Sequence, residues 1–257
     1  MRRIRLIIAY EGTEYVGWQT QGNGTAVQSV IEEAIFLITG ERVSLQGSGR
    51  TDSGVHARAQ VAHFDTAVRM PADKFAFALN TRLPEDIRIV YSDEAPEEFH
   101  SRFSAKEKEY RYCLYLSPHA DVFSRRFSLH VHSSLDIDKM RAAASLFPGE
   151  HDLAAFKSTG TTVATTVRTL YTSEWLLRGN RLEYRVSGNG FMYNTVRIMV
   201  GTMLGIGMGT LPDDAVAKAL LSRDRNDAGP TAPACGLTLW RVRYPGFDTE
   251  EHIPYDE

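Results

Sequence analysis

The chain has 257 residues, of which 43% are hydrophobic and 24% are charged, so it can form a globular core as one large domain or two small ones. A net charge of −3 excludes a protein that coats nucleic acid non-specifically, and no apolar run is long and uncharged enough to span a bilayer. The two cysteines form no metal-binding pattern and require no oxidising compartment, so a cytoplasmic location is predicted.

The acidic residues are unevenly distributed. Residues 247–257 hold five acids and no Lys or Arg, which leaves 27 acids against 29 basic residues in the rest of the chain. Because recognition of nucleic acid depends on where charge lies, this distribution is compatible with a local basic groove.

The first half of the chain is predicted to contain strands and two helices. Alternating apolar residues indicate a strand at 2–10. Residues 25–40 have helical spacing, with Thr25 and Gln28 resembling a capping box and Gly40 ending the helix. The remaining predicted elements are strands near 42–46, at 57–66 and at 85–92, and a short helix from Pro71 to about Asn80.

The second half loosely repeats this plan. Its predicted elements are a strand at 106–117, a helix capped by Asp136, a hairpin at 167–188 with its turn at Gly179 and Asn180, a helix at 191–208, a helix opened by Pro212, and a strand at 236–244. Strands and helices mix without a strict βαβ rhythm, so the predicted class is α+β with antiparallel sheet. The predicted halves are 1–104 and 105–246, followed by an acidic tail at 247–257.

One stretch, GSGRTDSGVHARAQVAHFDT at residues 47–66, sets a single carboxylate, Asp52, among glycines and arginines. Thr-Asp-Ser-Gly is good turn chemistry, so Asp52 can simply be a turn residue. It can also be a nucleophile or base on a rigid turn, kept ionised by a nearby guanidinium. The spacing leaves both interpretations open.

Other motifs are weaker. His56 and His63 are separated by six residues with no cysteine near, so no metal site is expected. Ser53, His56 and Asp52 lie too close in sequence to be expected to reach triad geometry. The glycines of GIGMGT at 205–210 follow a helix and not a strand, which favours a helix exit over a nucleotide-binding loop.

Two further side chains have both a structural and a functional interpretation. Tyr110 shares a strand face with Tyr112 and Leu114, which is typical of a core, but its charged surroundings suggest a half-exposed ring that could stack on a nucleobase. Arg197 adjoins an apolar helix stripe. It either extends to solvent or is a partly buried guanidinium that needs an anion such as Asp52.

Together these segments resemble the tRNA pseudouridine synthase A family, which modifies uridines 38–40 of the anticodon stem-loop. The resemblance spans nearly the whole chain, and its most specific part is GRTDSGVHA. The other segments are AYEGTEYVGWQTQ, TAVQSVIEEAI, LNTRLPEDIRIV, FHSRFSAKEKEYRY, GEHDLAAF, GNGFMYNTVRIMVG and ACGLTLWRVRY. The departures from the family pattern are Glu11, Ser53, Leu153 and Thr195.

The resemblance implies roles for five residues. Asp52 corresponds to the catalytic carboxylate, Tyr110 to the tyrosine that contacts the target base, and Arg197 to the basic partner of the aspartate. Arg50 and Arg58 look suited to phosphates or to holding the flipped nucleotide. The implied fold has two similar α+β halves whose sheets join over a central RNA-binding cleft, and the implied assembly is a homodimer spanned by tRNA, with no cofactor or metal.

The reaction implied by this resemblance breaks the N1–C1′ bond of uridine and rejoins the base through C5. Asp52 could attack C1′, attack C6 or remove the 2′ proton, and the sequence does not choose among these steps. Two alternatives remain: a pseudouridine synthase for another RNA site, and a non-catalytic RNA-binding module.

Overall fold

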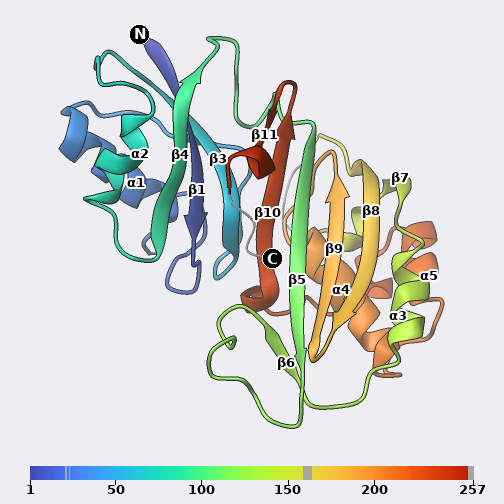
Figure 1. The fold of residues 1–257 in the computed structure, drawn as a ribbon. Coiled ribbons are helices and arrows are strands. Elements are labelled where there is room, and N and C mark those ends of the chain that lie inside the picture. The colour runs from blue at the N-terminus through green and yellow to red at the C-terminus, as the bar shows by residue number, and fades with distance from the viewer. Residues whose placement is uncertain (21, 23, 159–163, 254–257) are drawn as a thin grey trace. The chain divides into compact units, whose positions relative to one another are not determined.

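A computed structural model describes residues 1–20, 22, 24–158 and 164–253. The chain divides into two compact units. The first unit comprises Met1–Lys108 and Thr238–Glu257, and the second comprises Glu109–Leu237. Helices and strands are mixed in both units, so the predicted α+β class is confirmed (Figure 1). No helix in the described ranges has the length and apolar character needed to cross a membrane.

The first unit is built on a sheet with strand order β4-β1-β3-β10 (Figure 1). β1 is antiparallel to both of its neighbours, whereas β3 and β10 are parallel. The strands of this unit are β1 (Arg2–Tyr10), β2 (Gln46–Gly47), β3 (His56–Thr66), β4 (Ile87–Ala95), β10 (Leu237–Tyr244) and β11 (Phe247–Asp248).

Two helices, α1 (Val27–Thr39) and α2 (Lys74–Asn80), belong to the first unit. Gly40 ends α1 in the left-handed conformation, as predicted, and its N–H donates to the carbonyl of Phe36. The predicted capping box at Thr25 is wrong, because Ala26 is the N-cap and no side chain caps the helix. The Gln28 amide instead donates to Glu32 Oε1 and to the carbonyl of Leu45, which ties α1 to the chain before β2.

The end of the chain folds back onto the first unit. β10 pairs with β3, with Thr238 opposite His56, and β11 pairs with β10. Arg241 forms ion pairs with Asp248 and Glu250, and a 3₁₀ turn follows at Thr249–Glu251. The predicted division placed this last long strand in the second half and treated 247–257 as a tail. Strand pairing over a separation of about 180 residues, which no local pattern encodes, accounts for the difference. Residues 254–257 lie outside the described part.

The second unit contains strands in the order β5-β9-β8-β7, with β6 parallel to β5. The predicted hairpin is confirmed: β8 and β9 are antiparallel, Arg178 lies opposite Arg181, and Gly179 has a φ of +58°. The strands are β5 (Glu107–Leu116), β6 (Leu129–Val131), β7 (Gly149–Asp152), β8 (Val167–Arg178) and β9 (Arg181–Gly188).

Helix α4 (Thr195–Gly207) is the most buried helix of the second unit, and Arg197 is its one residue that is not fully buried. Its glycines permit close packing: a Cβ at Gly201 would lie 1.8 Å from the carbonyl oxygen of Pro230. α3 (Ile137–Ala144) is capped as predicted, with the Asp136 side chain accepting from Lys139 N. The remaining helices are α5 (Ala215–Ser222) and short 3₁₀ turns at Ala154–Phe156, Arg225–Asp227 and Ala234–Gly236.

Candidate active site

The loop that carries Asp52 joins β2 to β3 in the first unit, and its base is tied down by hydrogen bonds. Ser48 N donates to the carbonyl of Val61 at 2.7 Å, and the Ser48 hydroxyl donates to Gln60 Oε1 at 2.6 Å. The Gln60 amide donates to the carbonyl of Gly49 at 2.8 Å, and Lys108 Nζ donates to the carbonyl of Ser48 at 2.6 Å. The start of the loop is therefore fixed to β3 and to Lys108.

Asp52 itself begins a tight turn. Its carbonyl accepts a hydrogen bond from Val55 N at 3.1 Å, and Gly54 has a φ of +76° that suits glycine. The side chain of Asp52 is half-buried. The predicted turn is thus present, and it holds a partly desolvated carboxylate on a fixed backbone.

A second segment, residues 11–18, packs closely against this turn. Trp18 N donates to the carbonyl of Thr51 at 3.2 Å. Gly17 has a φ of +108°, and a Cβ there would lie 2.5 Å from the same carbonyl oxygen. A Cβ at Gly12 would lie 2.0 Å from the carbonyl oxygen of Val55. The two glycines are therefore required for the approach of one loop to the other.

A buried tyrosine supports the turn from the sheet. The Tyr10 hydroxyl lies 2.8 Å from the hydroxyl of Thr51, the residue before Asp52, and both residues are buried. Burial raises the pKa of Tyr10 well above its ordinary value, and the nearby negative charge of Asp52 acts in the same direction. Tyr10 is therefore a neutral phenol that positions the backbone next to the carboxylate.

The side chains of His56 and Ser53, which lie close to Asp52 in the chain, make hydrogen bonds that stabilise the local structure. His56 Nδ1 accepts a hydrogen bond from Gly12 N at 3.0 Å, and the Ser53 hydroxyl donates to the carbonyl of Tyr15 at 3.2 Å. His63, buried in β3, lies 2.7 Å from the Ser101 hydroxyl. Within the described ranges no group of three or more His, Cys, Asp or Glu residues could hold a metal ion.

The two arginines that flank Asp52 differ in their surroundings. Arg50 is exposed, and its side chain makes no hydrogen bond or ion pair with any residue that the structure describes. Arg58 is half-buried, and its guanidinium lies over the ring of Trp240, with 4.7 Å from Cζ to the ring centroid. The side chain of Arg50 is therefore accessible to a ligand, whereas the orientation of the Arg58 guanidinium is set by its contact with Trp240.

Tyr110 belongs to the second unit and is more buried than expected. Only 8% of it is exposed, and its ring meets Phe191 edge to face at 5.2 Å. The prediction of a half-exposed ring is therefore wrong, because Phe191, from the chain before α4, covers it. Tyr112 is a core residue whose hydroxyl donates to the carbonyl of Pro233 at 2.8 Å.

Arg197 also belongs to the second unit, near the start of α4. Its Nε donates to the carbonyl of Ala232 at 2.7 Å, and Nη1 donates to Asn194 Oδ1 at 2.9 Å. Asn194 adopts a left-handed backbone conformation with φ of +62°. The guanidinium is therefore held in place rather than extended freely into solvent. Its predicted pairing with Asp52, a residue of the other unit, stays a prediction.

Sequence reasoning missed three residues that support the site: Tyr10, Lys108 and Trp240. The conspicuous AYEGTEYVGWQTQ segment was a signal for the first, since its glycines and aromatics are unusual for a plain loop. The other two gave no local signal, because their partners lie 60 or more residues away in the chain.

An α+β chain with a half-buried carboxylate on a fixed turn, flanked by arginines, fits the class of enzymes that use a carboxylate on an anionic substrate. A family model described as "tRNA pseudouridine synthase" matches residues 6–104 and 143–245. The chain belongs to this family.

Curated relatives match along almost the whole chain. "tRNA pseudouridine synthase A" of Ruminiclostridium cellulolyticum is 49% identical over 245 residues, covering 95% of this chain and 100% of the relative. The proteins of the same name from Brevibacillus brevis and Acetivibrio thermocellus are each 46% identical, over 244 and 245 residues, and again 95% of this chain and 100% of the relative are covered.

Proposed function

We propose that this protein isomerises uridine to pseudouridine in tRNA, at positions 38–40 of the anticodon stem-loop, with Asp52 as the catalytic carboxylate. Membership of the tRNA pseudouridine synthase family carries this proposal. The geometry around Asp52 supports its assignment, since the loop is fixed at its base, at its turn and by the segment at 11–18. Catalysis by positioning requires that the reacting group is held rigidly in place.

The reaction exchanges one bond for another. The N1–C1′ bond breaks, the uracil turns, a C5–C1′ bond forms, and the proton on C5 moves to N1 by way of solvent or a side chain. Asp52 begins as a carboxylate, whether it attacks C1′, attacks C6 or removes the 2′ proton. The target nucleotide must leave the base stack to reach it.

The other predicted residues have supporting roles in this proposal. Arg50, exposed beside Asp52, is suited to an RNA phosphate, and Arg58 holds the extruded nucleotide. Tyr110 contacts the target base through the part of its ring or hydroxyl that Phe191 leaves uncovered. Arg197, held by Ala232 and Asn194, supplies the positive charge that keeps Asp52 ionised.

The same proposal includes the oligomeric state of the protein and its location in the cell. The protein acts as a homodimer in the cytoplasm, with one tRNA spanning both subunits, and it needs no cofactor or metal because the isomerisation exchanges no electrons or groups with a second substrate.

The test uses an anticodon stem-loop tRNA carrying tritium at C5 of uridine, with wild type beside Asp52→Ala and Asp52→Asn. Wild type should release tritium to water, and both variants should lose release by several orders of magnitude while binding tRNA normally. Asp52→Asn keeps the shape of the side chain, so loss of tRNA binding in that variant would mean that Asp52 serves structure or binding. Circular dichroism spectra confirm that each variant is folded.

A panel of other RNAs labelled in the same way separates the alternatives. Release of tritium from another RNA, with none from the anticodon stem-loop, would show that the enzyme modifies a different RNA site. Binding without release from any labelled RNA would identify a non-catalytic RNA-binding module.

A further inference from the structure

Most basic side chains of the second unit are already engaged. Several arginines and lysines form ion pairs: Arg111 with Glu109, Lys139 with Asp213, Arg141 with Asp138, Arg185 with Glu183, Lys218 with Asp227, and Arg223 with Asp152. Arg168 and Arg225 donate to backbone carbonyls. An exposed arginine without such a partner is therefore unusual in this unit.

Three exposed arginines, Arg125, Arg178 and Arg181, make no hydrogen bond or ion pair with any described residue. Arg178 and Arg181 flank the β8–β9 turn. The turn lies beside the end of β5, because Leu116 N donates to the carbonyl of Asn180 at 2.7 Å. Arg125 belongs to the loop that follows β5, at the same end of the second unit (Figure 1).

Electrostatic coupling supports this proximity. The positive charge of Arg181 acts on the carboxyl of Asp121, whose pKa is lowered chiefly by a hydrogen bond from Ser124. Asp121 and Arg125 line the same pocket. Residues 117–132 and 178–181 together hold four arginines and a single acid, Asp121. The carboxylate oxygens of Asp121 accept hydrogen bonds from the backbone N–H groups of Phe123 and Ser124. The surface is therefore positive in a chain of net charge −3.

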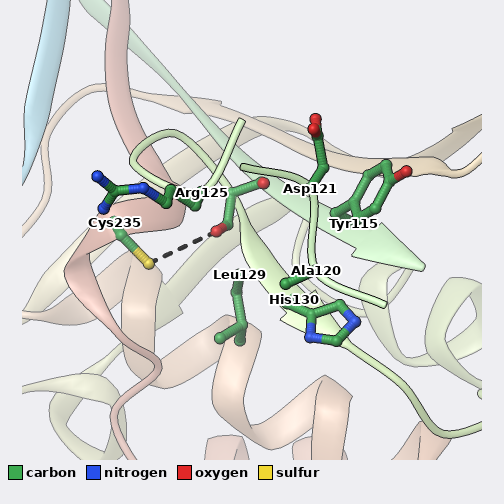
Figure 2. Close-up of a pocket in the computed structure, with 8 residues that line it drawn as sticks. Tyr115, Ala120, Asp121, Arg125, Leu129, His130 and Cys235 are labelled. Atoms are coloured by element: carbon green, nitrogen blue, oxygen red, sulfur yellow. Dashed lines mark hydrogen bonds between the residues drawn. The ribbon is translucent and has the colours of Figure 1, made fainter. Parts of the chain in front are cut away.

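The same loop exposes aromatic rings. Phe123 is 93% exposed and Phe127 is 47% exposed. The adjoining pocket has a volume of about 180 Å³, with Arg125 on one side and the rings of Tyr115 and His130 on the other (Figure 2). Exposed rings beside arginines suit stacking of unpaired bases and contact with phosphates. Protein interface cores are also enriched in aromatic residues and Arg, but the excess of arginines over acids in this surface favours a polyanion such as RNA.

We propose that Arg125, Arg178, Arg181 and Phe123 form a second RNA-binding surface, which we call the loop surface. The arginines bind backbone phosphates, and Phe123 stacks on an unpaired base. The inference rests on the proposed function in taking the RNA to be the tRNA substrate. The loop that carries Arg125 and Phe123 lies within residues 105–142, which the family model does not match, whereas Arg178 and Arg181 lie within its second matched range, 143–245.

The experiment measures binding of a full-length tRNA transcript by fluorescence anisotropy at several salt concentrations. The test variant combines Arg125→Gln, Arg178→Gln and Arg181→Gln. The matched control combines Lys139→Gln, Lys218→Gln and Arg223→Gln, which removes the same charge from exposed ion pairs of the same unit. Each phosphate contact contributes about 0.7–0.9 to the slope of log affinity against log salt, so the test variant should lose about two units of slope and the control less than one.

Equal slopes in the two variants would overturn the proposal. Phe123→Ala should weaken tRNA binding about tenfold if a base stacks on the ring. If that variant instead changes the sedimentation of the protein and leaves tRNA affinity intact, the ring belongs to a protein interface and the loop surface is rejected.

The tritium-release assay on wild type distinguishes a failure of this proposal from a failure of the proposed function. Release together with equal slopes refutes the loop surface alone. Absence of release from every labelled RNA, together with a slope difference, refutes the enzyme activity and supports the loop surface.

Discussion

The guanidinium of Arg58 lies 4.7 Å from the ring centroid of Trp240, a residue 182 positions later in the chain. Two features of the sheet create this contact. A β-bulge sets Arg58 and Ala59 of β3 opposite Ala9 alone, since Ile8 faces Gln60 and Tyr10 faces Ala57. The parallel pairing of β10 with β3 brings Trp240 to the same level. Bulges redirect side chains and are common beside active sites.

This contact predicts that Trp240 positions Arg58 for RNA. Trp240→Leu should weaken tRNA binding by about 0.5–2 kcal/mol, the range of a cation–π interaction, and Trp240→Phe should retain part of the affinity. The measurement is a double-mutant cycle with Arg58→Ala, read by tRNA affinity. If Trp240 acts through Arg58, Trp240→Leu has little further effect when Arg58 is absent. Fully additive losses would show that the two residues act independently.

The hydrogen bond between Tyr10 and Thr51 predicts a specific effect on catalysis. Tyr10→Phe should cost about 1 kcal/mol of unfolding free energy and lower kcat about tenfold or more, because the turn that carries Asp52 loses a fixed point. The control is Tyr184→Phe in the second unit, whose buried hydroxyl lies 2.7 Å from that of Ser173. Urea unfolding and single-turnover rates are measured for both. An equal loss of kcat in the two variants would remove the proposed positioning role.

Thr195 predicts a stabilising substitution. Its hydroxyl is buried at the start of α4 and has no hydrogen-bond partner among the described residues. Thr195→Val removes a desolvated polar group at nearly constant shape, so the free energy of unfolding should rise by about 1 kcal/mol. Thr202→Val is the control, because its hydroxyl donates to the carbonyl of Ile198 and accepts from Gly229 N. That variant should be destabilised. Destabilisation of both would show that the Thr195 hydroxyl is satisfied in solution.

His63 predicts a pH dependence of stability. Burial, followed by the positive charge of Arg3, lowers its pKa to about 4, below the ordinary value of 6.5. The unfolded chain therefore binds a proton that the folded chain excludes, and the free energy of unfolding should rise with pH between about 4 and 6.5, by up to about 3 kcal/mol. Urea unfolding across this range checks the slope. His63→Gln should flatten it, and an unchanged slope would assign the effect to other groups.

The sequence by itself determined the features that depend on neighbouring residues. Helical spacing and Gly40 located α1 and its end, Asp136 marked the cap of α3, and Gly179 with Asn180 located the β8–β9 turn. Turn chemistry likewise placed Asp52 on a tight turn. In each case the interactions that decide the structure lie within a few positions along the chain, so a local pattern is enough.

Only the tertiary structure decided what surrounds these features. It returned β10 to the first unit, placed Trp240 over Arg58, and covered Tyr110 with Phe191. It also replaced the predicted cap at Thr25 by packing of Gln28 against the chain before β2. These outcomes depend on strand register, on a bulge and on burial by segments distant in sequence. Their energies come from contacts that exist only after the chain has folded, so no local pattern can encode them.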